Sequence, residues 1–287
     1  MSAVTPALRL GPATLGGAAG PREQTIDARW LMAYAAALGE TNPRCFDTAA
    51  PAGPVAHPLF SVCYEWPLAV ELRETVIGDA IAPFSVHATH DLLIHRPPRA
   101  GDVLSTKAHV VEVRPVKAGT LVVVRFETVD RRGAPVTTTS YGSIYRGVGC
   151  DGATPASRPA PSLPADAGAV SWEARVEMGP HLAHVYTECA RIWNPIHTDI
   201  AVARAAGLPG LILHGTATLA LAVSRVVAHD LGGDPARVRG VAVRFAGMVP
   251  LPSTFVVRGR DARDTDVHFD AVDTAGRPVL GRGVLRR

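Results

Sequence analysis

The chain has 287 residues, of which 47% are hydrophobic and 19% charged, and its formal net charge is +3. This length suits one large or two medium domains, and the composition is that of an ordinary globular protein with a buried core. The basic residues are scattered, and only Lys107 and Lys117 among them are lysines, so the sequence lacks the basic tract typical of a nucleic-acid-binding protein.

The cysteines show neither the spacing of a metal site nor that of a disulfide framework; they are Cys45, Cys63, Cys150 and Cys189. A reducing cytoplasm is therefore the expected compartment. Residues 1–20 are rich in glycine and alanine, without the charged start and apolar block of a signal peptide, and are predicted to form a flexible leader. The apolar run 211–227 contains His214, Thr216 and Arg225, which make it too polar for a membrane span.

The first half of the chain opens with a predicted helix and continues as strands. From Asp27, apolar side chains recur at helical spacing up to Leu38, and Gly39 is suited to end the helix. A second apolar run, 59–70, is also helix-like, and Pro67 is expected to kink it. Four strands separated by turn signals follow and predict an antiparallel meander, at 85–95, 103–113, 120–129 and 136–145.

Residues 149–168 are rich in Pro, Ala and Gly, which predicts a linker, and the same plan then repeats. A strand is predicted at 170–178, helices at 181–193, 200–206 and 211–231, and strands at 238–245, 254–262, 265–273 and 278–285. We therefore expect two domains of similar plan, at 21–148 and 169–287.

Two pairs of residues mark the repeat. Asn42 and Asn194 are 152 residues apart, and His57 and His214 are 157 residues apart. The two separations differ so little that only a small insertion distinguishes the halves.

The second half contains a segment suited to chemistry, Asn194-Pro195-Ile196-His197-Thr198-Asp199. Pro195 moves Asn194 out of the helical region, so Asn194 and His197 are expected on an irregular loop, with Asp199 capping the next helix. His214-Gly215 then stands at the head of a long helix. The free amides and positive dipole end of that helix can hold a substrate oxygen as negative charge develops on it.

This combination of motifs resembles the MaoC-like or R-specific enoyl-CoA hydratase (hydratase 2) pattern, over about residues 25–287. The resemblance implies an α+β double hot-dog fold, in which each half wraps a curled antiparallel sheet around one long helix. It also implies the addition or removal of water across a 2-enoyl/3-hydroxyacyl thioester. Carried over by position, His197 is the general acid/base, Asn194 orients the loop, and the Gly215 amide binds the thioester oxygen.

The acid of the family's Gly-Asp-x-Asn-Pro-x-His segment is missing, because Ile192 stands at its position. Glu188 lies one helical turn earlier and is a candidate substitute, although a solvent-facing glutamate is the favoured interpretation. Tyr186, Arg191 and His214 are candidates for substrate binding. Arg191 is suited to a substrate carboxylate, but an arginine on an exposed face would be unremarkable.

Structural alternatives apply to the two main candidates: His197 can be a buried structural histidine, and Gly215 can permit tight backbone packing at a helix start. The first half departs from the pattern in the opposite way. Glu40 stands at the acidic position, but Cys45 replaces the histidine and Pro58 replaces the glycine. Proline has no N–H to donate, so this half is predicted to be non-catalytic and to shape a cavity for an acyl chain or pantetheine arm.

Three functions fit these observations. The first is a hydratase or dehydratase acting on an acyl-CoA or acyl-carrier thioester, the second a non-catalytic module that binds an acyl thioester or a partner protein, and the third a thioesterase on the same fold. No metal or redox cofactor is expected, since the thioester already acidifies the α-carbon. Open sheet edges predict a homo-oligomer, and neither nucleic acid nor a membrane is expected as a partner.

Overall fold

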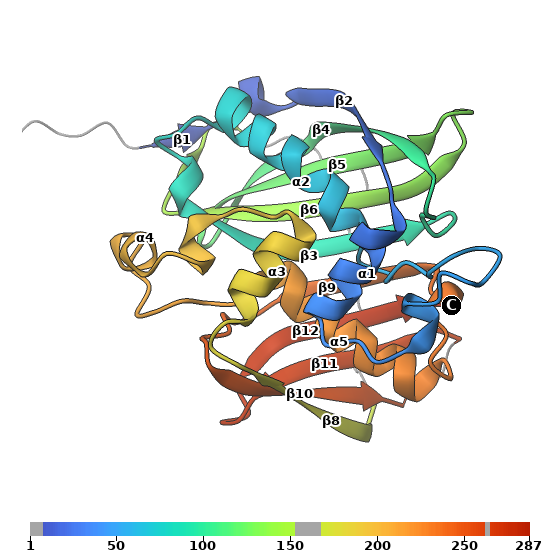
Figure 1. Cartoon of the computed structure of the whole chain (residues 1–287). Helices are drawn as coiled ribbons and strands as arrows, with labels where there is room; N and C mark the ends of the chain where they lie inside the picture. Colours follow the sequence, from blue (N-terminus) through green and yellow to red (C-terminus); the bar gives the residue numbers. More distant parts are fainter. Residues whose placement is uncertain (1–7, 153–167, 262–264) are drawn as a thin grey trace, which may run out of the picture.

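The computed structural model describes residues 8–152, 168–261 and 265–287, and its main feature is one antiparallel sheet of ten strands (Figure 1). The strand order across this sheet is β2-β4-β5-β6-β3-β9-β12-β11-β10-β8. The first five strands in that order come from the first half of the chain and the last five from the second half. The long helices lie over one face of the sheet, as Figure 1 shows.

The first half begins its helical part at Asp27, whose side chain accepts a hydrogen bond from the backbone N–H of Trp30 at 2.7 Å. Pro67 lies inside the second helix, which continues through it to Leu72 and then passes into a π-helical turn, Arg73–Ile77. The elements of this half are α1 (Ala28–Ala37), α2 (Ser61–Leu72), β2 (Ala18–Thr25), β3 (Ser85–Ile94), β4 (Val103–Val116), β5 (Gly119–Asp130) and β6 (Pro135–Arg146).

The second half repeats this plan and adds one short helix. Asp199 caps that helix by accepting hydrogen bonds from the N–H groups of Ala201 and Val202 at 2.8 and 3.2 Å, which confirms its expected structural role. The elements are β8 (Val170–Met178), α3 (Leu182–Ala190), α4 (Ile200–Ala205), α5 (Gly215–Asp230), β9 (Gly240–Phe245), β10 (Ser253–Arg260), β11 (Val267–Asp273) and β12 (Pro278–Arg286).

The two halves join through the sheet and through a pair of equivalent tyrosines. β3 pairs with β9, with Thr89 opposite Arg244 and Leu93 opposite Gly240, so the sheet continues across the boundary. Tyr34 on α1 and Tyr186 on α3 are 152 residues apart, and their hydroxyl oxygens lie 3.5 Å from each other. The predicted repeat and the α+β double hot-dog architecture are therefore confirmed.

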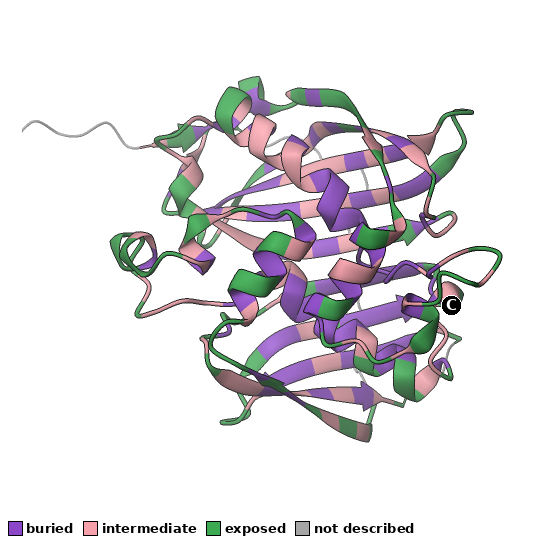
Figure 2. Ribbon diagram, viewed as in Figure 1, coloured by how far each residue is buried: buried purple, intermediate pink, exposed green. Residues whose placement is uncertain are grey.

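α5 is the central helix of the second half. Every residue from Ala217 to Val223 is buried, because small alanines alternate with larger apolar side chains and let the sheet approach the helix closely. Along the strands, buried and less buried positions form bands in Figure 2, as expected where successive side chains point to opposite faces. This packing fixes the position of Gly215, the first residue of α5.

Two sequence-based expectations are corrected at the edges of the fold. Residues 9–10 and 18–20 do not belong to a flexible leader, because they lie in β1 (Arg9–Leu10) and β2, and Leu10 and Ala19 are buried. β1 pairs with β7 (Gly149–Cys150), so the predicted linker begins later than residue 149. The central part of that linker, 153–167, falls outside the described residues.

The last long helix also starts later than its apolar run suggests. Leu213 donates its backbone N–H to the carbonyl oxygen of Val249 at 2.8 Å, and Ile212 forms an isolated bridge with Pro250. These residues are therefore extended, and the predicted helix 211–231 is shortened to α5. The strand-like entry places His214 directly before the first helical turn.

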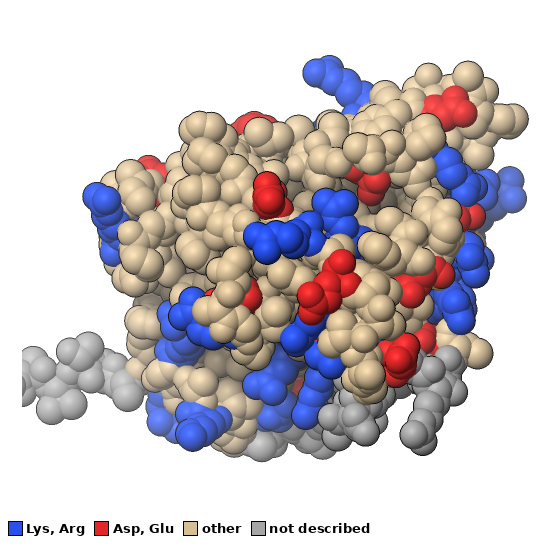
Figure 3. Space-filling view, turned by 90° about the horizontal axis from the view of Figure 1, so that it is seen from below, with Lys and Arg blue, Asp and Glu red and all other residues tan. Residues whose placement is uncertain are grey.

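Acidic and basic side chains lie side by side on the face seen in Figure 3. In the described part of the chain, no helix combines the length and the apolar character required to cross a membrane.

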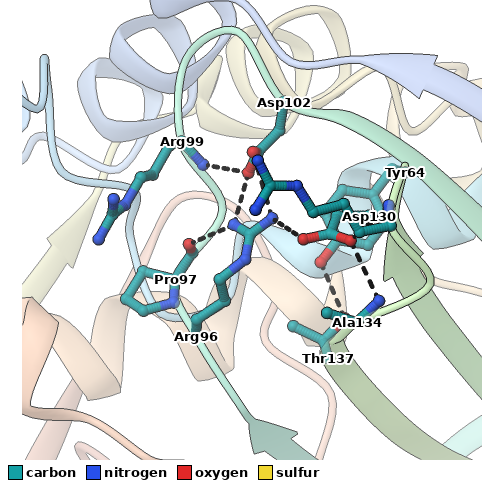
Figure 4. Close-up of polar contacts among 9 residues, drawn as sticks. Tyr64, Arg96, Pro97, Arg99, Asp102, Asp130, Ala134 and Thr137 are labelled. Carbon is teal, nitrogen blue, oxygen red and sulfur yellow. Dashed lines mark hydrogen bonds and ion pairs between the residues drawn. The ribbon is translucent and has the colours of Figure 1, made fainter.

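A partly buried ion-pair network ties the β3–β4 connection to the β5–β6 turn (Figure 4). The Arg96 guanidinium donates to Asp102 at 2.7 Å and to Asp130 at 3.3 Å, and Asp102 also accepts the backbone N–H of Arg99 at 2.8 Å. The side chains of Arg96, Asp102 and Asp130 are 29%, 18% and 21% exposed. Each is sheltered enough for the loss of its partner to matter.

Arg96→Met should therefore lower the thermal unfolding midpoint by about 4 °C, since two carboxylates lose their shared cation while the aliphatic stem remains. The measurement is the midpoint followed by circular dichroism at pH 7. Arg131→Met, in the exposed β5–β6 turn, is the matched control and should leave the midpoint almost unchanged. Equal midpoints for both variants would mean that the network contributes nothing to stability.

Candidate active site

The loop that carries His197 is held by backbone hydrogen bonds at both ends. α3 ends at Arg191, which adopts a left-handed conformation with φ of 59°, and the N–H of Ile192 returns to the carbonyl oxygen of Thr187 at 3.1 Å. Pro195 then begins a single 3-10 turn in which the N–H of His197 donates to the carbonyl oxygen of Asn194 at 3.1 Å. The proline-bent loop expected from the sequence is present, and Asn194 braces it through its backbone.

His197 has a defined tautomer. Its Nδ1 lies 2.9 Å from the carbonyl oxygen of Ile212. A carbonyl oxygen can only accept, so Nδ1 carries the proton and Nε2 carries the free lone pair. Burial lowers the pKa of His197 to about 4, with the Ile212 carbonyl acting in the opposite direction, and the imidazole is therefore neutral at pH 7.

His214 supports the His197 ring from one side. The two rings are stacked, with centroids 3.7 Å apart and planes 29° apart. Nε2 of His214 lies 3.2 Å from the hydroxyl oxygen of Thr187, which fixes the second ring on α3. Burial, and then the neighbouring His197, hold the pKa of His214 well below its usual value, so both rings remain neutral. His214 is thus a positioning residue for His197.

Gly215 begins α5 immediately after His214, and the N–H groups of the first helical turn have no acceptor within the helix. A Cβ added to Gly215 would lie 3.3 Å from Cε1 of Phe245 and 3.5 Å from Nδ1 of His87. A side chain here would be packed tightly against the Phe245 ring, which supports the tight-packing explanation. Gly215 directly follows His214, whose ring is stacked on that of His197, so the positive end of the helix and the His197 loop meet at His214.

Gly215→Ala is expected to reduce activity about tenfold while lowering stability by about 1 kcal/mol, because the new methyl group must displace Phe245 or the start of the helix. Steady-state kinetics and a denaturant titration measure the two effects. Ala217→Gly, two residues further along the same turn, serves as a control for backbone flexibility. An alanine variant with full activity would show that the position of this amide is not critical.

A surface groove with a volume of about 360 Å³ borders the His197 loop, and its walls come from α3 and from the loop itself. It is lined by His184, Thr187, Glu188, Trp193, Asn194, Pro195 and Thr198. Glu188 is exposed in this groove. Among the described residues, no carboxylate forms a hydrogen bond or an ion pair with His197. Glu188 lines the groove beside the His197 loop, and its role as a substitute acid stays a prediction.

The other predicted substrate-binding residues have structural contacts. Tyr186 is fully buried and donates its hydroxyl to Oγ1 of Thr216 at 3.0 Å. The Arg191 guanidinium lies over the Trp30 ring, with Cζ 4.0 Å from the centroid, and it does not line the groove. Ile192 occupies the position of the family's acid and is packed in the main hydrophobic core at 3% exposure. Tyr186 and Ile192 are thus buried parts of the site, and a substrate contact of Tyr186 or Arg191 stays a prediction.

The equivalent loop of the first half has a structural role. Glu40 accepts hydrogen bonds from the backbone N–H groups of Thr41 and Asn42, each at 3.0 Å. The Asn42 side chain donates to the carbonyl oxygen of Gly233, beyond the end of α5. Burial raises the pKa of the Cys45 thiol to about 11, so this side chain cannot take the role of the imidazole at pH 7.

Two family models match the chain. The MaoC like domain matches residues 169–278, and the FAS1-like dehydratase domain region matches residues 13–139. The first match contains the whole His197 loop and the start of α5. The second half of the chain is a MaoC-like domain. The first half is similar to a FAS1-like dehydratase region. The second half has His197 and Gly215 at the positions of the resembled motif and Ile192 at the position of its acid.

Relatives of this MaoC-like chain include enzymes of thioester metabolism. Probable enoyl-CoA hydratase 2 of Dictyostelium discoideum is 24% identical over 236 residues, which are 80% of this chain and 79% of that protein. Fatty acid synthase beta subunit pkiC of Emericella nidulans is 43% identical over 73 residues, or 25% of this chain. The chain matches only 4% of the length of that fungal subunit.

Solved structures share the whole fold. The crystal structure of a MaoC-like dehydratase from Phytophthora capsici has a TM-score of 0.83 at 24% identity, covering 96% of each chain. Rv0216 of Mycobacterium tuberculosis, described as a double hot-dog fold, has a TM-score of 0.60 at 19% identity, covering 96% of this chain and 97% of its own. These structural similarities establish the fold of the chain. Its chemistry must be inferred from the residues of the site.

Proposed function

We propose that this protein is a hydro-lyase that adds water to, or removes it from, the double bond of a 2-enoyl/3-hydroxyacyl thioester. The observation that carries the proposal is the stacking of His197, whose Nε2 has a free lone pair, on His214, the residue directly before the N-terminal amides of α5 at Gly215. The imidazole of His197 can transfer a proton, and the amides can stabilise negative charge that develops on a substrate oxygen. The proposal is also supported by relatives with hydratase and dehydratase names.

In the hydration direction, Nε2 of His197 takes a proton from a water molecule as the water oxygen bonds to carbon 3 of the acyl group. The π electrons move to the thioester carbonyl, whose oxygen becomes an enolate oxyanion held by the Gly215 amide. The imidazolium then returns its proton to the α-carbon, which regenerates the neutral ring. The Nδ1–H bond to the Ile212 carbonyl stabilises the transient imidazolium.

This mechanism uses a single imidazole as both base and acid. It needs no metal or redox group, because the thioester carbonyl itself takes up the electrons. The substrate would be a CoA or carrier-protein thioester, and the groove beside Asn194 and Trp193 offers a path for its pantetheine arm. The free cysteines, two of them buried, fit the proposed cytoplasmic location, and a homo-oligomer through the sheet edges β2 and β8 stays a prediction.

The test follows the conjugated enone absorbance of trans-2-enoyl-CoA thioesters of increasing acyl length, together with release of free thiol. Loss of absorbance without thiol release supports hydration. Thiol release with the double bond intact would instead identify a thioesterase. The reverse reaction, started from each enantiomer of the 3-hydroxyacyl-CoA, determines the stereochemistry.

A second candidate function is an acyl-thioester-binding module without turnover. It is favoured by one observation, the apolar Ile192 at the acid position, since His197 has no carboxylate partner among the residues described. The same assay separates the two. Saturable binding of acyl-CoA, measured by calorimetry, with neither hydration nor dehydration over hours, would establish the binding module and overturn the hydro-lyase.

A further inference from the structure

Two histidines of the first half lie on the inner side of β3, close to the start of α5. The His87 ring is stacked on Tyr141 of β6, with centroids 3.7 Å apart and planes 17° apart, and it also contacts Phe245 of β9 at 4.1 Å. The centroid of the His90 ring is 5.5 Å from that of the His87 ring, and His90 is opposite Tyr141 in the β3–β6 pairing. The four aromatic side chains form a wall, the His87–His90 wall, at the junction of the two halves.

His87 presents an acceptor to this junction. Its Nε2 lies 3.1 Å from the carbonyl oxygen of Thr89, so Nε2 carries the proton and Nδ1 carries the lone pair. That Nδ1 is the atom that would lie 3.5 Å from a Cβ on Gly215. A hydrogen-bond acceptor therefore lies next to the helix start that binds the thioester oxygen in the proposed reaction.

His90 is the less usual of the two. It is 1% exposed, and within residues 8–152, 168–261 and 265–287 neither of its ring nitrogens has a hydrogen-bond partner. A buried polar group without a partner costs about 1–3 kcal/mol, whereas an apolar side chain of the same shape would cost nothing. Burial lowers the pKa of His90 to about 4, so the ring is neutral and offers one donor and one acceptor.

The chemistry of the His87–His90 wall selects one kind of partner. A hydroxyl group both donates and accepts, and it can give its hydrogen to Nδ1 of His87 while receiving the N–H of His90. A keto oxygen cannot satisfy Nδ1 of His87, because it has no hydrogen to give. A metal ion does not fit either, since no third ligand from the described chain joins the two imidazoles.

We propose that the His87–His90 wall binds a hydroxyl group on the acyl chain, so that the preferred substrates are thioesters of hydroxylated acyl groups rather than plain fatty acyl groups. This inference rests on the proposed function, which places the thioester oxygen at Gly215, next to His87 of the first half. The hydroxyl is distinct from the one formed at carbon 3, which belongs to His197. His87 and His90 are then specificity residues that contact the substrate away from the reacting atoms.

The test measures binding of four saturated ligands by isothermal titration calorimetry: hexanoyl-CoA and its 4-, 5- and 6-hydroxy derivatives. At least one hydroxylated ligand should bind about tenfold more tightly than hexanoyl-CoA to the unmodified protein. Since saturated ligands without a 3-hydroxyl group can be neither hydrated nor dehydrated, the result does not depend on the proposed turnover. Failure of all four to bind would overturn the proposed function as well as this inference, whereas equal binding of all four would overturn the inference alone.

Variants locate the preference. His90→Phe and His87→Phe should each reduce the tenfold preference to less than about twofold. His90→Phe should also keep or raise the unfolding midpoint, because it removes a buried polar group without a partner. His95→Phe, an exposed histidine just beyond the same strand, is the matched control and should retain the preference. A preference that survives in both wall variants would assign the two histidines a purely structural role.

Discussion

His197→Ala is expected to lower kcat/KM for enoyl-CoA hydration about 10³-fold, because the variant has no group that can remove a proton from water or return one to the α-carbon. The folded structure should survive, since the side chain forms one hydrogen bond, to the Ile212 carbonyl, with a net value of about 1 kcal/mol. Steady-state kinetics on the longest turned-over enoyl-CoA, with circular dichroism as the check on folding, measure both effects.

His229→Ala is the matched control, because His229 is an exposed histidine in the last turn of the same helix that Gly215 begins. Its activity should match that of the unmodified protein. The pH profile adds a second criterion. The pKa of His197 is about 4, so the base stays neutral on acidification and kcat/KM should be nearly constant from pH 7 to pH 5. Unchanged turnover by His197→Ala would remove this residue from the mechanism.

Much of the architecture follows from local patterns that the sequence displays directly. The strands from Ser85 to Arg146 alternate apolar and polar residues between turn signals, and their bounds differ from the predicted ones by only a few residues. The 152-residue separation of Asn42 and Asn194 recurs in the contact between Tyr34 and Tyr186. A repeat visible in two short motifs was sufficient to predict the paired halves.

The errors arise where distant residues decide the structure. Residues 18–20 look flexible by composition, but β2 pairs with β4 through a register that joins Ala19 to Ala108, far along the chain. The helix predicted from residue 211 begins at Gly215, because the preceding residues bond to Val249 and Pro250. Local propensity cannot reveal such partners.

The candidate site likewise has features that the sequence predicts and features that depend on distant residues. His197 and Gly215 were identifiable because their motifs are local and resemble a known pattern. Three other contacts could not be predicted from the sequence, because they join residues that are distant along the chain. The Ile212 carbonyl sets the tautomer of His197, the Thr187 hydroxyl fixes His214, and His87 approaches Gly215. His87 comes from the other half of the chain, and its only sequence signal was a histidine in a predicted strand.

Glu65 is a buried carboxyl that the proposed reaction does not use. It lies on α2 at 4% exposure and accepts a hydrogen bond of 2.6 Å from the hydroxyl of Thr139 on β6. Burial raises its pKa from the usual 4.5 to about 7, and the Thr139 hydroxyl only partly offsets this. The folded protein therefore holds Glu65 protonated under conditions where the unfolded chain has lost that proton.

The free energy of unfolding should consequently fall as the pH rises from about 4.5 to 7. Below pH 4.5 the carboxyl is protonated in both states and its contribution is fully present; between the two pKa values unfolding releases a proton; above pH 7 both states are ionised and no further change occurs. A shift of this size corresponds to about 3 kcal/mol.

Glu65→Gln, which stays neutral, should lose this pH-dependent part of the free energy of unfolding. Glu74→Gln, in the exposed turn after α2, should retain it. Urea titrations of all three proteins at half-unit pH steps measure the difference, and parallel curves for the unmodified protein and Glu65→Gln would show that the carboxyl is ionised in the folded state.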